Sequence, residues 1–362
     1  MNPPEIEDLG AIVPPLLRSL GALEFISRYL NPQDFAAMMA ACGTPEDDLR
    51  EALPRLETWS PGLGGLGTAL TLASTHVLQA FQDLRRVPEQ ADGLGAAYRA
   101  LRHLPRAQEA LYALACGLPP VSRYFLDSPR RDDTHLLEHL AQSRPDTGIL
   151  HFDNDPGSRG GYSVYVPETY DPDISLPLVM ALHGGSGHGR GFLWSWLRDA
   201  RTYGAVLVAP TSIGRTWAIS GEDADTPNLA RILDAVRARW TVDPQRMLLA
   251  GMSDGGTFAY VSGMETTSPF THLAPTSAAF HPMLTQFADI DRIAGLPVHI
   301  THGVLDWMFP VTMAREAQVA LSGAGAQVVY REIADLSHAY PRELNADILT
   351  WLNATPKVDL RE

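Results

Sequence analysis

Apolar positions follow helical spacing in the first part of the chain, whereas strand-like and helix-like runs alternate in the rest. Over residues 16–140 the apolar positions follow helical spacing, in a segment rich in Ala, Leu, Arg and Glu. Prolines interrupt this segment and divide it into several short predicted helices. A glycine-rich stretch, residues 61–67, is interpreted as a loop between two of them, with close approach to a ligand as the alternative. The pattern predicts an all-α N-terminal domain, residues 1–145.

Strand-like and helix-like runs alternate in the second part, after a polar stretch rich in Gly, Pro and Asp at residues 143–161. The predicted strands are residues 162–166, 178–182, 205–209, 247–250, 298–301 and 327–333. The predicted helices are residues 192–203, 229–240, 255–264, 312–321 and 341–351. Such alternation is typical of a mostly parallel sheet with helices on both faces. We therefore expect the α/β class for a second domain, residues 146–362.

One predicted strand ends in Gly251-Met252-Ser253-Asp254-Gly255, a G-x-S-x-G motif that continues into a predicted helix. In this context the motif is typical of a nucleophile elbow, a sharp turn that exposes the serine hydroxyl. The two glycines lack a Cβ atom, so the strand and the helix can approach closely while the serine takes a strained conformation. The motif predicts that Ser253 is a nucleophile.

A second predicted strand ends in a glycine-rich turn at residues 183–187. The backbone NH groups of such a turn can hold the oxygen that becomes negative in a tetrahedral intermediate. We expect the NH groups of Gly185 and Asp254 to form this oxyanion hole, and His183 to shape the turn. A phosphate-binding loop is the alternative, but the turn lacks the Lys-Ser/Thr ending of a Walker A loop. The carboxylate of Asp254 is expected to point away from the oxyanion, which it would repel.

An acidic residue and a histidine follow later predicted strands. Asp306 lies just past the strand at 298–301, and His338 follows the last strand. A catalytic histidine needs an acid that fixes its tautomer. Asp306 is preferred for this role over Asp335 and Asp289, because it comes just beyond a strand. The other histidines are interpreted as structural or pocket-lining residues.

The resulting order of serine, aspartate and histidine resembles that of the α/β-hydrolase superfamily, and the chain looks most like its phospholipase/carboxylesterase and dienelactone-hydrolase-like esterases. The resemblance spans residues 162–352 and rests on four motifs, at residues 182–185, 251–256, 302–306 and 336–338. It implies an α/β-hydrolase fold in which Ser253 is the nucleophile, His338 the base and Asp306 the orienting acid. The implied activity is hydrolysis of small carboxylic esters through an acyl-enzyme, without a cofactor or a metal.

Other functions stay open on the sequence. A peptidase, a thioesterase or a polyester depolymerase of the same fold are the alternatives among enzymes. A hydrolase-like binding module that has lost catalysis is the alternative outside them. Trp307, Phe309 and Trp217 are expected to bind substrate, although packing in the core agrees equally well with their positions.

A second motif points to different chemistry. Residues 135–139 read H-x-x-E-H, which is typical of the zinc site of inverzincins. His135 and His139 would share one face of a helix, but a third ligand is needed and the segment lies beside the interdomain linker. We expect no metal at this motif.

Composition restricts the partners and the compartment. The net charge is −14, with 42 acidic and 28 basic residues and no long basic run, which argues against nucleic acid as a partner. The two cysteines, Cys42 and Cys116, are too few for a disulfide framework. Neither a basic signal-peptide region nor a segment of membrane-spanning length is recognised, so a cytoplasmic location is expected. The helical domain is interpreted as a lid, a dimerisation surface or a docking domain, and a homo-oligomer would form through it.

Overall fold

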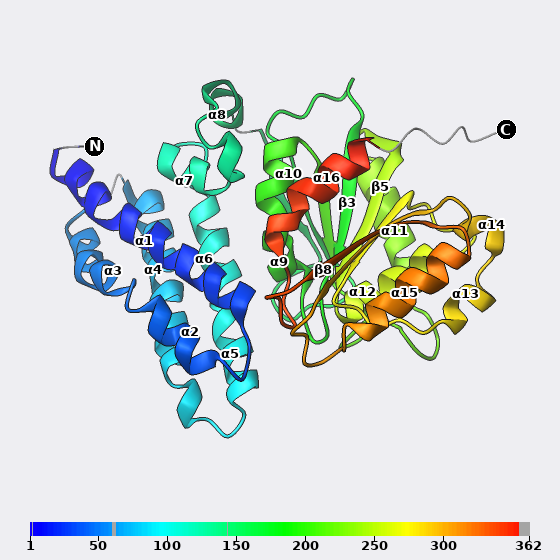
Figure 1. Ribbon diagram of the computed structural model, residues 1–362. Coiled ribbons are helices and arrows are strands. Elements are labelled where there is room, and N and C mark those ends of the chain that lie inside the picture. The colour runs from blue at the N-terminus through cyan, green and yellow to red at the C-terminus, as the bar shows by residue number, and fades with distance from the viewer. Residues whose placement is uncertain (2, 60–62, 143, 355–362) are drawn as a thin grey trace. The chain divides into compact units, whose positions relative to one another are not determined.

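The computed structural model describes residues 1, 3–59, 63–142 and 144–354. The chain divides into two compact units, Met1–Gln142 and Ser143–Glu362. In Figure 1 the first unit is drawn in blue to teal and consists of helices. The second unit, drawn in green to red, contains a sheet covered by helices. Each unit buries apolar side chains of its own.

Two long helices, of 27 and 22 residues, and several short ones make up the described part of the first unit, and prolines mark several of the breaks between the short ones. Pro54 and Pro88 lie at the start of 3-10 helices, and Pro119 begins an α-helix, as the sequence predicts. The 3-10 helices are η1 (Leu53–Thr58), η3 (Val87–Glu89) and η4 (Ser128–Arg130). The α-helices are α1 (Pro3–Tyr29), α2 (Phe35–Cys42), α3 (Asp47–Ala52), α4 (Gly64–Arg85), α5 (Gly93–Leu101), α6 (His103–Tyr112), α7 (Pro119–Tyr124) and α8 (Thr134–Leu140).

Helix α1 supplies much of the core of this unit. It packs against α3, α4 and α6. Apolar residues three or four positions apart share one face of the helix, and the fully buried ones are Ile12, Leu16, Leu20, Leu23 and Ile26. By length and composition alone, α1 also qualifies as a helix that spans a membrane. The expectation that the chain has no such segment therefore stays a prediction.

The glycine-rich stretch at residues 61–67 differs from its interpretation as a loop. Residues 61 and 62 lie outside the described residues, but Gly64, Gly65 and Gly67 belong to the first turns of α4. Each glycine costs a helix about 1 kcal/mol relative to alanine. Burial of the helix further along, at Leu70, Ala73 and Val77, offsets this cost and extends the helix back over the glycines.

The second unit is built on one eight-stranded sheet in the order β1-β2-β4-β3-β5-β6-β7-β8. Strands β1 and β2 are antiparallel to their neighbours, and the other pairs are parallel. The strands are β1 (Gly148–Phe152), β2 (Tyr162–Val166), β3 (Leu176–Leu182), β4 (Val206–Pro210), β5 (Val242–Met252), β6 (His272–Thr276), β7 (Pro297–Gly303) and β8 (Gln327–Ile333). The predicted class, a mostly parallel sheet in an α/β unit, is confirmed.

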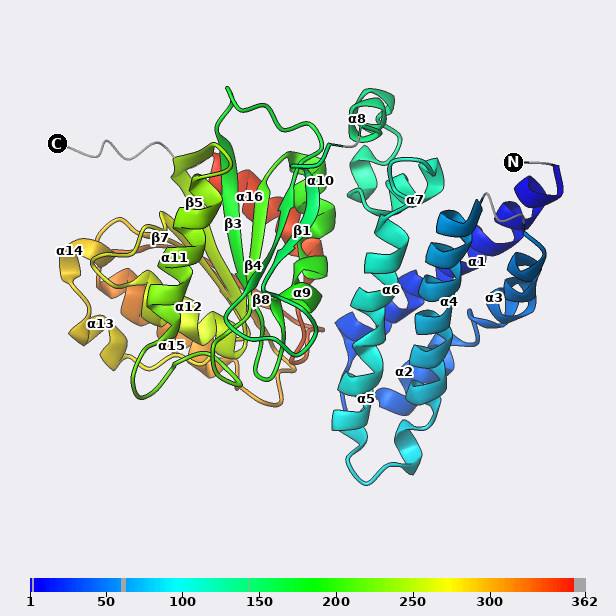
Figure 2. The ribbon, with the colours of Figure 1, turned by 180° about the vertical axis from the view of Figure 1, so that it is seen from behind.

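Helices cover both faces of this sheet. Figures 1 and 2 show α10 and α16 on one face and α11 and α12 on the other. The α-helices are α9 (Gly189–Phe192), α10 (Leu197–Tyr203), α11 (Asp225–Arg237), α12 (Asp254–Gly263), α13 (Met283–Phe287), α14 (Ile290–Ile293), α15 (Thr312–Gly323) and α16 (Asn345–Ala354). Two 3-10 helices, η5 (Leu193–Ser195) and η6 (Arg342–Leu344), precede α10 and α16.

Burial on both faces explains the strand sequences. Strands β2, β4, β6 and β7 are buried at every position, so most of their residues are apolar or small, without an alternating pattern, and the exceptions include three buried histidines in β6 and β7. The parallel strands β3, β4, β5 and β7 end at the same edge of the sheet. The loops that follow them and the parallel strand β8, together with the first residue of α12, carry every residue that the sequence predicts for the site.

Two strands are not predicted from the sequence. Strand β6 contains Pro275, which cannot donate a hydrogen bond to the sheet and so argues against a central strand. Strand β1 begins at Gly148, inside the polar stretch that was interpreted as a linker. Strand β6 forms all the same because it pairs with β5 and β7 on its two sides, and β1 forms because it pairs with β2. In both strands the pairing overrides the local sequence signal.

Two histidines are buried where the sheet meets α16. The rings of His272 in β6 and His299 in β7 pack against Trp351, with centroids 4.9 Å and 5.6 Å away. Burial lowers the pKa of each ring to about 4, because the charged imidazolium loses its hydration there. Both rings are therefore neutral at physiological pH.

This burial predicts acid sensitivity of the fold. A histidine in the unfolded chain takes up a proton near pH 6.5, whereas these two rings stay neutral until about pH 4. The unfolded state thus binds more protons between these values, and the free energy of unfolding should fall as the pH is lowered from 6.5 to 5, by on the order of 1 kcal/mol per histidine. Urea titrations at both pH values measure it. His299→Gln should reduce the fall, and the same change at the exposed His281 should not; equal slopes in both variants would refute the assignment.

Candidate active site

Ser253 lies on a strained turn between β5 and α12. Its φ is 55° and its ψ is −122°, a conformation that residues with a side chain rarely adopt. The turn is tight because two glycines allow close backbone contact. A Cβ atom on Gly251 would lie 2.3 Å from the carbonyl oxygen of Gly255, and one on Gly255 would lie 2.5 Å from that of Leu182. The chain thus adopts the nucleophile elbow that its motif predicts.

The structure brings Ser253, His338 and Asp306 together from three separate loops. The Oγ of Ser253 lies 3.0 Å from Nε2 of His338. The Nδ1 of the same ring lies 3.0 Å and 2.9 Å from the two carboxylate oxygens of Asp306. A carboxylate accepts, so Nδ1 carries the proton and Nε2 is left to accept from the serine hydroxyl. All three residues are buried.

Asp306 is held by the backbone of its own turn. The NH groups of Met308 and Phe309 donate to its Oδ1 over 2.9 Å and 2.8 Å. Burial alone raises the pKa of the carboxyl, but hydrogen bonds from His302, His338 and the NH of Phe309 lower it by more. The net pKa lies well below its usual range, so the group is a carboxylate at neutral pH.

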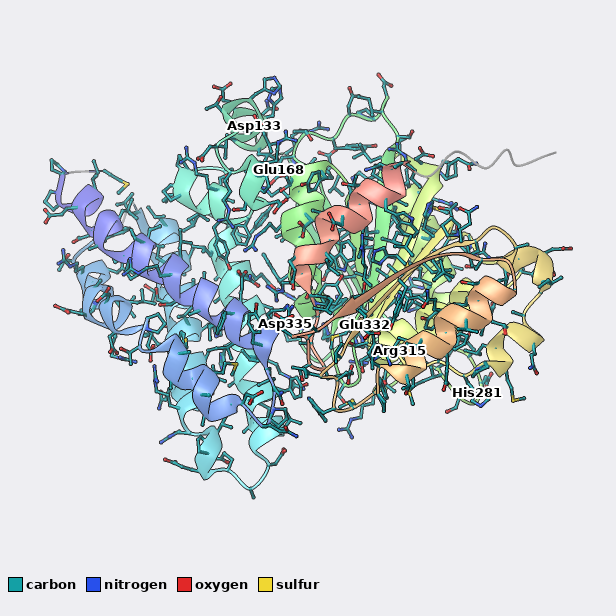
Figure 3. The ribbon with its side chains drawn as sticks, viewed as in Figure 1. Asp133, Glu168, His281, Arg315, Glu332 and Asp335 are labelled. Carbon is teal, nitrogen blue, oxygen red and sulfur yellow. The ribbon has the colours of Figure 1, made fainter. Side chains whose placement is uncertain are left out.

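The two alternative acids differ from Asp306 in their surroundings. Asp289 caps helix α14 by accepting from the NH of Asp291. Asp335, labelled in Figure 3, is exposed on the loop after β8. The acid bonded to the ring of His338 is Asp306, the residue that the sequence favours.

The turn at residues 183–187 lies beside the serine and is braced from within. A Cβ atom on Gly184 would lie 3.5 Å from Cβ of Ser253. The Nδ1 of His183 donates to the carbonyl of Gly184 over 2.7 Å, and its Nε2 accepts from the NH of Ser212 over 3.1 Å. Burial lowers the pKa of His183 to about 3, so the ring is neutral and both bonds hold in one tautomer. His183 shapes the turn, as expected.

Two backbone donors point to an oxyanion site. Among the described residues, the NH groups of Gly185 and Asp254 donate to no protein acceptor. They belong to the turn after β3 and to the first residue of α12. Unused donors on either side of a nucleophile are what an oxyanion hole requires.

The carboxylate of Asp254 has a partner that the sequence does not reveal. It accepts from the hydroxyl of Thr216 over 2.6 Å. Its Oδ2 also lies only 2.6 Å from where a Cβ atom of Gly185 would stand, so it packs directly against the turn. Thr216 belongs to a loop without a recognisable motif, and sequence reasoning therefore misses it.

The aromatic residues divide into two groups. Trp307 is 39% exposed, and its ring meets the ring of His338 at 5.9 Å, while Phe309 meets it at 5.4 Å. Both rings therefore lie beside the candidate base. The interpretation of Trp217 as a substrate-binding residue is corrected: it is 2% exposed, stacks on Phe258 and donates from Nε1 to the carbonyl of His183 over 2.7 Å. It supports the turn from inside the core.

The H-x-x-E-H motif forms helix α8. The Nδ1 of His139 bonds to the backbone carbonyl of His135, so this ring nitrogen is used within the helix. Over the described residues, no group of three or more His, Cys, Asp or Glu side chains is arranged to hold a metal ion.

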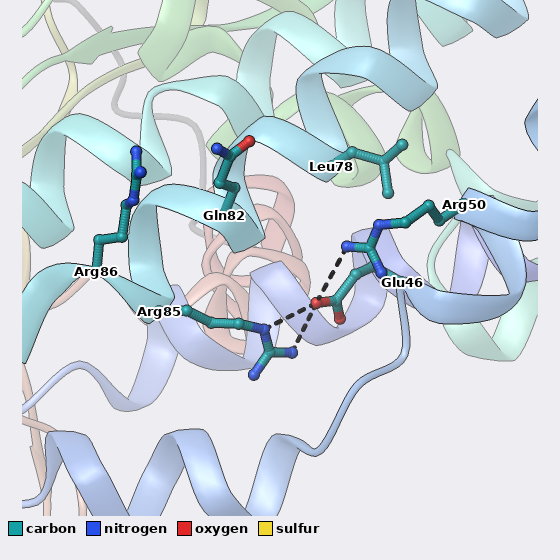
Figure 4. Close-up of a pocket in the computed structure, with 6 residues that line it drawn as sticks. All are labelled: Glu46, Arg50, Leu78, Gln82, Arg85 and Arg86. Carbon is teal, nitrogen blue, oxygen red and sulfur yellow. Dashed lines mark hydrogen bonds and ion pairs between the residues drawn. The ribbon is translucent and has the colours of Figure 1, made fainter.

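An open pocket of about 500 Å³ lies in the helical unit. Figure 4 shows Glu46 between two arginines in this pocket. Its Oε1 accepts from Arg85 over 2.9 Å and 2.7 Å, and Arg50 lies 3.8 Å away. The buried carboxylate is compensated by these cations, so the cluster is explained by folding of the helical unit.

The sheet order, the elbow at Ser253 and the loops that converge on it define the α/β-hydrolase fold. The fold that the resemblance implies is therefore confirmed. No protein-family model matches the chain.

Two curated proteins are similar in sequence. A bifunctional acetylxylan esterase/xylanase of Neocallimastix patriciarum is 25% identical over 209 residues, which cover 56% of this chain and 30% of that protein. A poly(3-hydroxybutyrate) depolymerase of Ralstonia pickettii is 28% identical over 114 residues, 25% of this chain and 23% of that protein. The chain thus matches less than a third of the length of each. Among solved structures, a fluorophosphonate-binding serine hydrolase of Staphylococcus aureus is 16% identical with a TM-score of 0.43, over 56% of this chain and 96% of that one.

The close contact at the elbow predicts an asymmetry between two glycines. In Gly255→Ala the new methyl group would lie 2.5 Å from two carbonyl oxygens, so the free energy of unfolding should fall by about 1–3 kcal/mol. Gly323→Ala, at the end of α15, meets nothing within 4 Å and should be neutral or stabilising by up to about 1 kcal/mol. Urea unfolding of both variants tests this. Wild-type stability in Gly255→Ala would show that β3 and α12 do not approach as described.

Proposed function

We propose that the chain hydrolyses carboxylic esters, with Ser253 as the nucleophile. The observation that carries this proposal is the chain of hydrogen bonds from the hydroxyl of Ser253 through the ring of His338 to the carboxylate of Asp306. The unused NH groups of Gly185 and Asp254 support an oxyanion hole beside it. This chemistry needs no metal or cofactor.

The first half of the reaction forms an acyl-enzyme. The Oγ of Ser253 attacks the ester carbonyl carbon while Nε2 of His338 takes the hydroxyl proton. The carbonyl oxygen becomes negative and accepts from the NH groups of Gly185 and Asp254, each such donor being worth about 3 kcal/mol in known cases. His338 then gives its proton to the leaving alcohol as the carbon–oxygen bond breaks.

The second half releases the acid. His338 takes a proton from water, the resulting hydroxide attacks the acyl carbon, and the proton returns to Oγ of Ser253 as the acid leaves. In both halves Asp306 holds Nδ1 protonated and stabilises the imidazolium that forms. The low pKa of Asp306 keeps it ionised for this role.

The curated relatives favour an ester over a peptide bond. One is named as an acetylxylan esterase and the other as a depolymerase of poly(3-hydroxybutyrate), which is a polyester. These names, together with the serine site, support an esterase over a peptidase or a thioesterase. Trp307 and Phe309, beside His338, are proposed to contact the substrate.

A polyester is a second candidate substrate, because the turn around Asp306 is unusually apolar on its outer side. Four of its side chains are between 39% and 47% exposed, those of Val304, Leu305, Trp307 and Met308. Exposed apolar side chains gathered at one place mark a binding surface. A water-insoluble ester would cover this turn while a chain segment reaches Ser253.

Three expectations about the whole protein stay predictions. They are a cytoplasmic location, the lack of a membrane-spanning segment, and a homo-oligomer that forms through the helical unit. A lid or a docking role for that unit is equally untested.

Loss of the hydroxyl of Ser253 tests the proposed activity. In Ser253→Ala the nucleophile is absent, so hydrolysis of p-nitrophenyl acetate should fall by at least about 1000-fold, with unfolding unchanged. Ser262→Ala, which removes another buried serine from α12, is the matched control and should retain the rate. A fluorophosphonate should label the wild type and the control at Ser253. Labelling at a different serine, or turnover that survives Ser253→Ala, would refute the assignment.

Exchange of the apolar turn separates the two candidate substrates. In a Leu305→Ser/Met308→Ser double variant, the rate on poly(3-hydroxybutyrate) films should fall relative to the rate on p-nitrophenyl acetate, because less apolar surface is buried on the polymer. The double variant Ile174→Ser/Val319→Ser changes exposed apolar residues outside this turn and is the control. An unchanged ratio would exclude this turn as the surface that binds the polymer, and no polymer hydrolysis by the wild type would exclude the polyester as a substrate.

A further inference from the structure

Arg159, in the connection between β1 and β2, links two loops at the edge of the site. Its Nη1 donates to the carbonyl of Gly187 over 2.8 Å. Its Nε and Nη2 both donate to the carbonyl of Gly214, over 2.9 Å and 2.5 Å, and Nη2 also donates to the hydroxyl of Ser212. One planar guanidinium therefore joins the loop after β3 to the loop after β4.

The NH of Gly187 closes the turn that carries Gly185, and the carbonyl of the same residue accepts from Arg159. The NH of Gly187 donates to the carbonyl of Gly184 over 3.0 Å, so the peptide NH of Gly185 lies inside a hydrogen-bonded turn. A fixed donor at the far end of this turn limits its rotation. Arg159 is that donor.

The loop after β4 braces the same turn from behind. Ser212 donates from its NH to His183, and Trp217 donates to the carbonyl of His183. Thr216 holds the carboxylate of Asp254 against Gly185. Arg159 thus ties both the turn and its support to a third segment of chain.

Partial burial of the Arg159 guanidinium costs stability, and the surroundings of the group offset this cost only through hydrogen bonds. Among the described residues, its guanidinium forms no ion pair within 4 Å and is met only by carbonyl and hydroxyl oxygens. The nearby carboxylate of Asp225 is engaged by the NH groups of Ile213 and Ala218. A partly buried cation without a counter-ion is destabilising unless its donors are well used. Its fork geometry suits two backbone carbonyls at fixed separation, which lysine cannot bridge in the same way.

We propose that Arg159 is a positioning residue that orients the NH of Gly185 toward the oxyanion. The inference rests on the proposed ester hydrolysis and deepens it, because it names a residue that acts on the transition state through the backbone. The oxyanion exists in the transition state and hardly at all in the bound ester. Loss of Arg159 therefore lowers kcat and leaves KM nearly unchanged.

The test compares Arg159→Ala and Arg159→Lys with a matched control, Arg231→Ala. Arg231 lies on α11 and donates to the carbonyl of Gly160, next to Arg159, and its hydrogen bonds among the described residues go to Asn228 and Gly160 rather than to the turn at residues 183–187. Rates on p-nitrophenyl acetate are expressed per active site, counted by exhaustive fluorophosphonate labelling. Arg159→Ala should lose about 10-fold or more in kcat, with KM within about twofold. Arg231→Ala should keep the wild-type kcat, even if both variants lose thermal stability.

Two further measurements keep the result decisive. Guanidinium ion added at millimolar concentration should restore part of kcat in Arg159→Ala and none in Arg231→Ala. Arg159→Lys, which keeps the charge, should fold and still lose kcat, because an ammonium group cannot bridge both carbonyls. If Arg159→Ala does not fold, the Lys variant decides the question. An unchanged kcat per active site in a folded Arg159 variant overturns the proposal, whereas an inactive wild type overturns the esterase itself.

Discussion

Close contact between β5, α12 and β3 is the constraint on which the rest of the second unit depends. Ser253 can hold a positive φ only because Gly251 and Gly255 let the backbone segments touch. The same contact places the serine beside the turn after β3, so the nucleophile and its expected oxyanion donors are fixed by backbone rather than by mobile side chains. Packing of the strands on both faces keeps this geometry rigid.

Electrostatics at the site follow from burial of neutral and charged groups side by side. His183 is kept neutral, which lets a single tautomer serve both ends of its ring. Asp306 is kept charged, because bonds from His302, His338 and its own turn outweigh the cost of burial. The proposed proton transfer at His338 therefore takes place between a fixed anion and fixed amide dipoles, with little reorganisation during reaction.

Local sequence motifs predict part of this arrangement. The elbow at Ser253, the turn at 183–187 and the acid and histidine after later strands are all set by short patterns at strand ends. Trp217 could not be assigned correctly, because whether an aromatic ring faces a substrate or the core depends on packing between distant elements. Thr216 and Arg159 leave no trace in the sequence, since they act on backbone groups far away along the chain. Strand β6, with its proline, is recognisable only once its neighbours are paired.

The turn that carries Asp306 separates two tasks within the six residues 304–309. Its amide groups grip the carboxylate, while the side chains at 304, 305, 307 and 308 face outward. Those side chains can be exchanged without moving the acid as long as the main chain keeps its path, so the outer side of the turn is open to variation while Asp306 stays in place. A proline at 308 or 309 is the exception, because it would delete one of the two amides that grip the acid. The turn is thus a natural place to change the substrate preference of the proposed esterase.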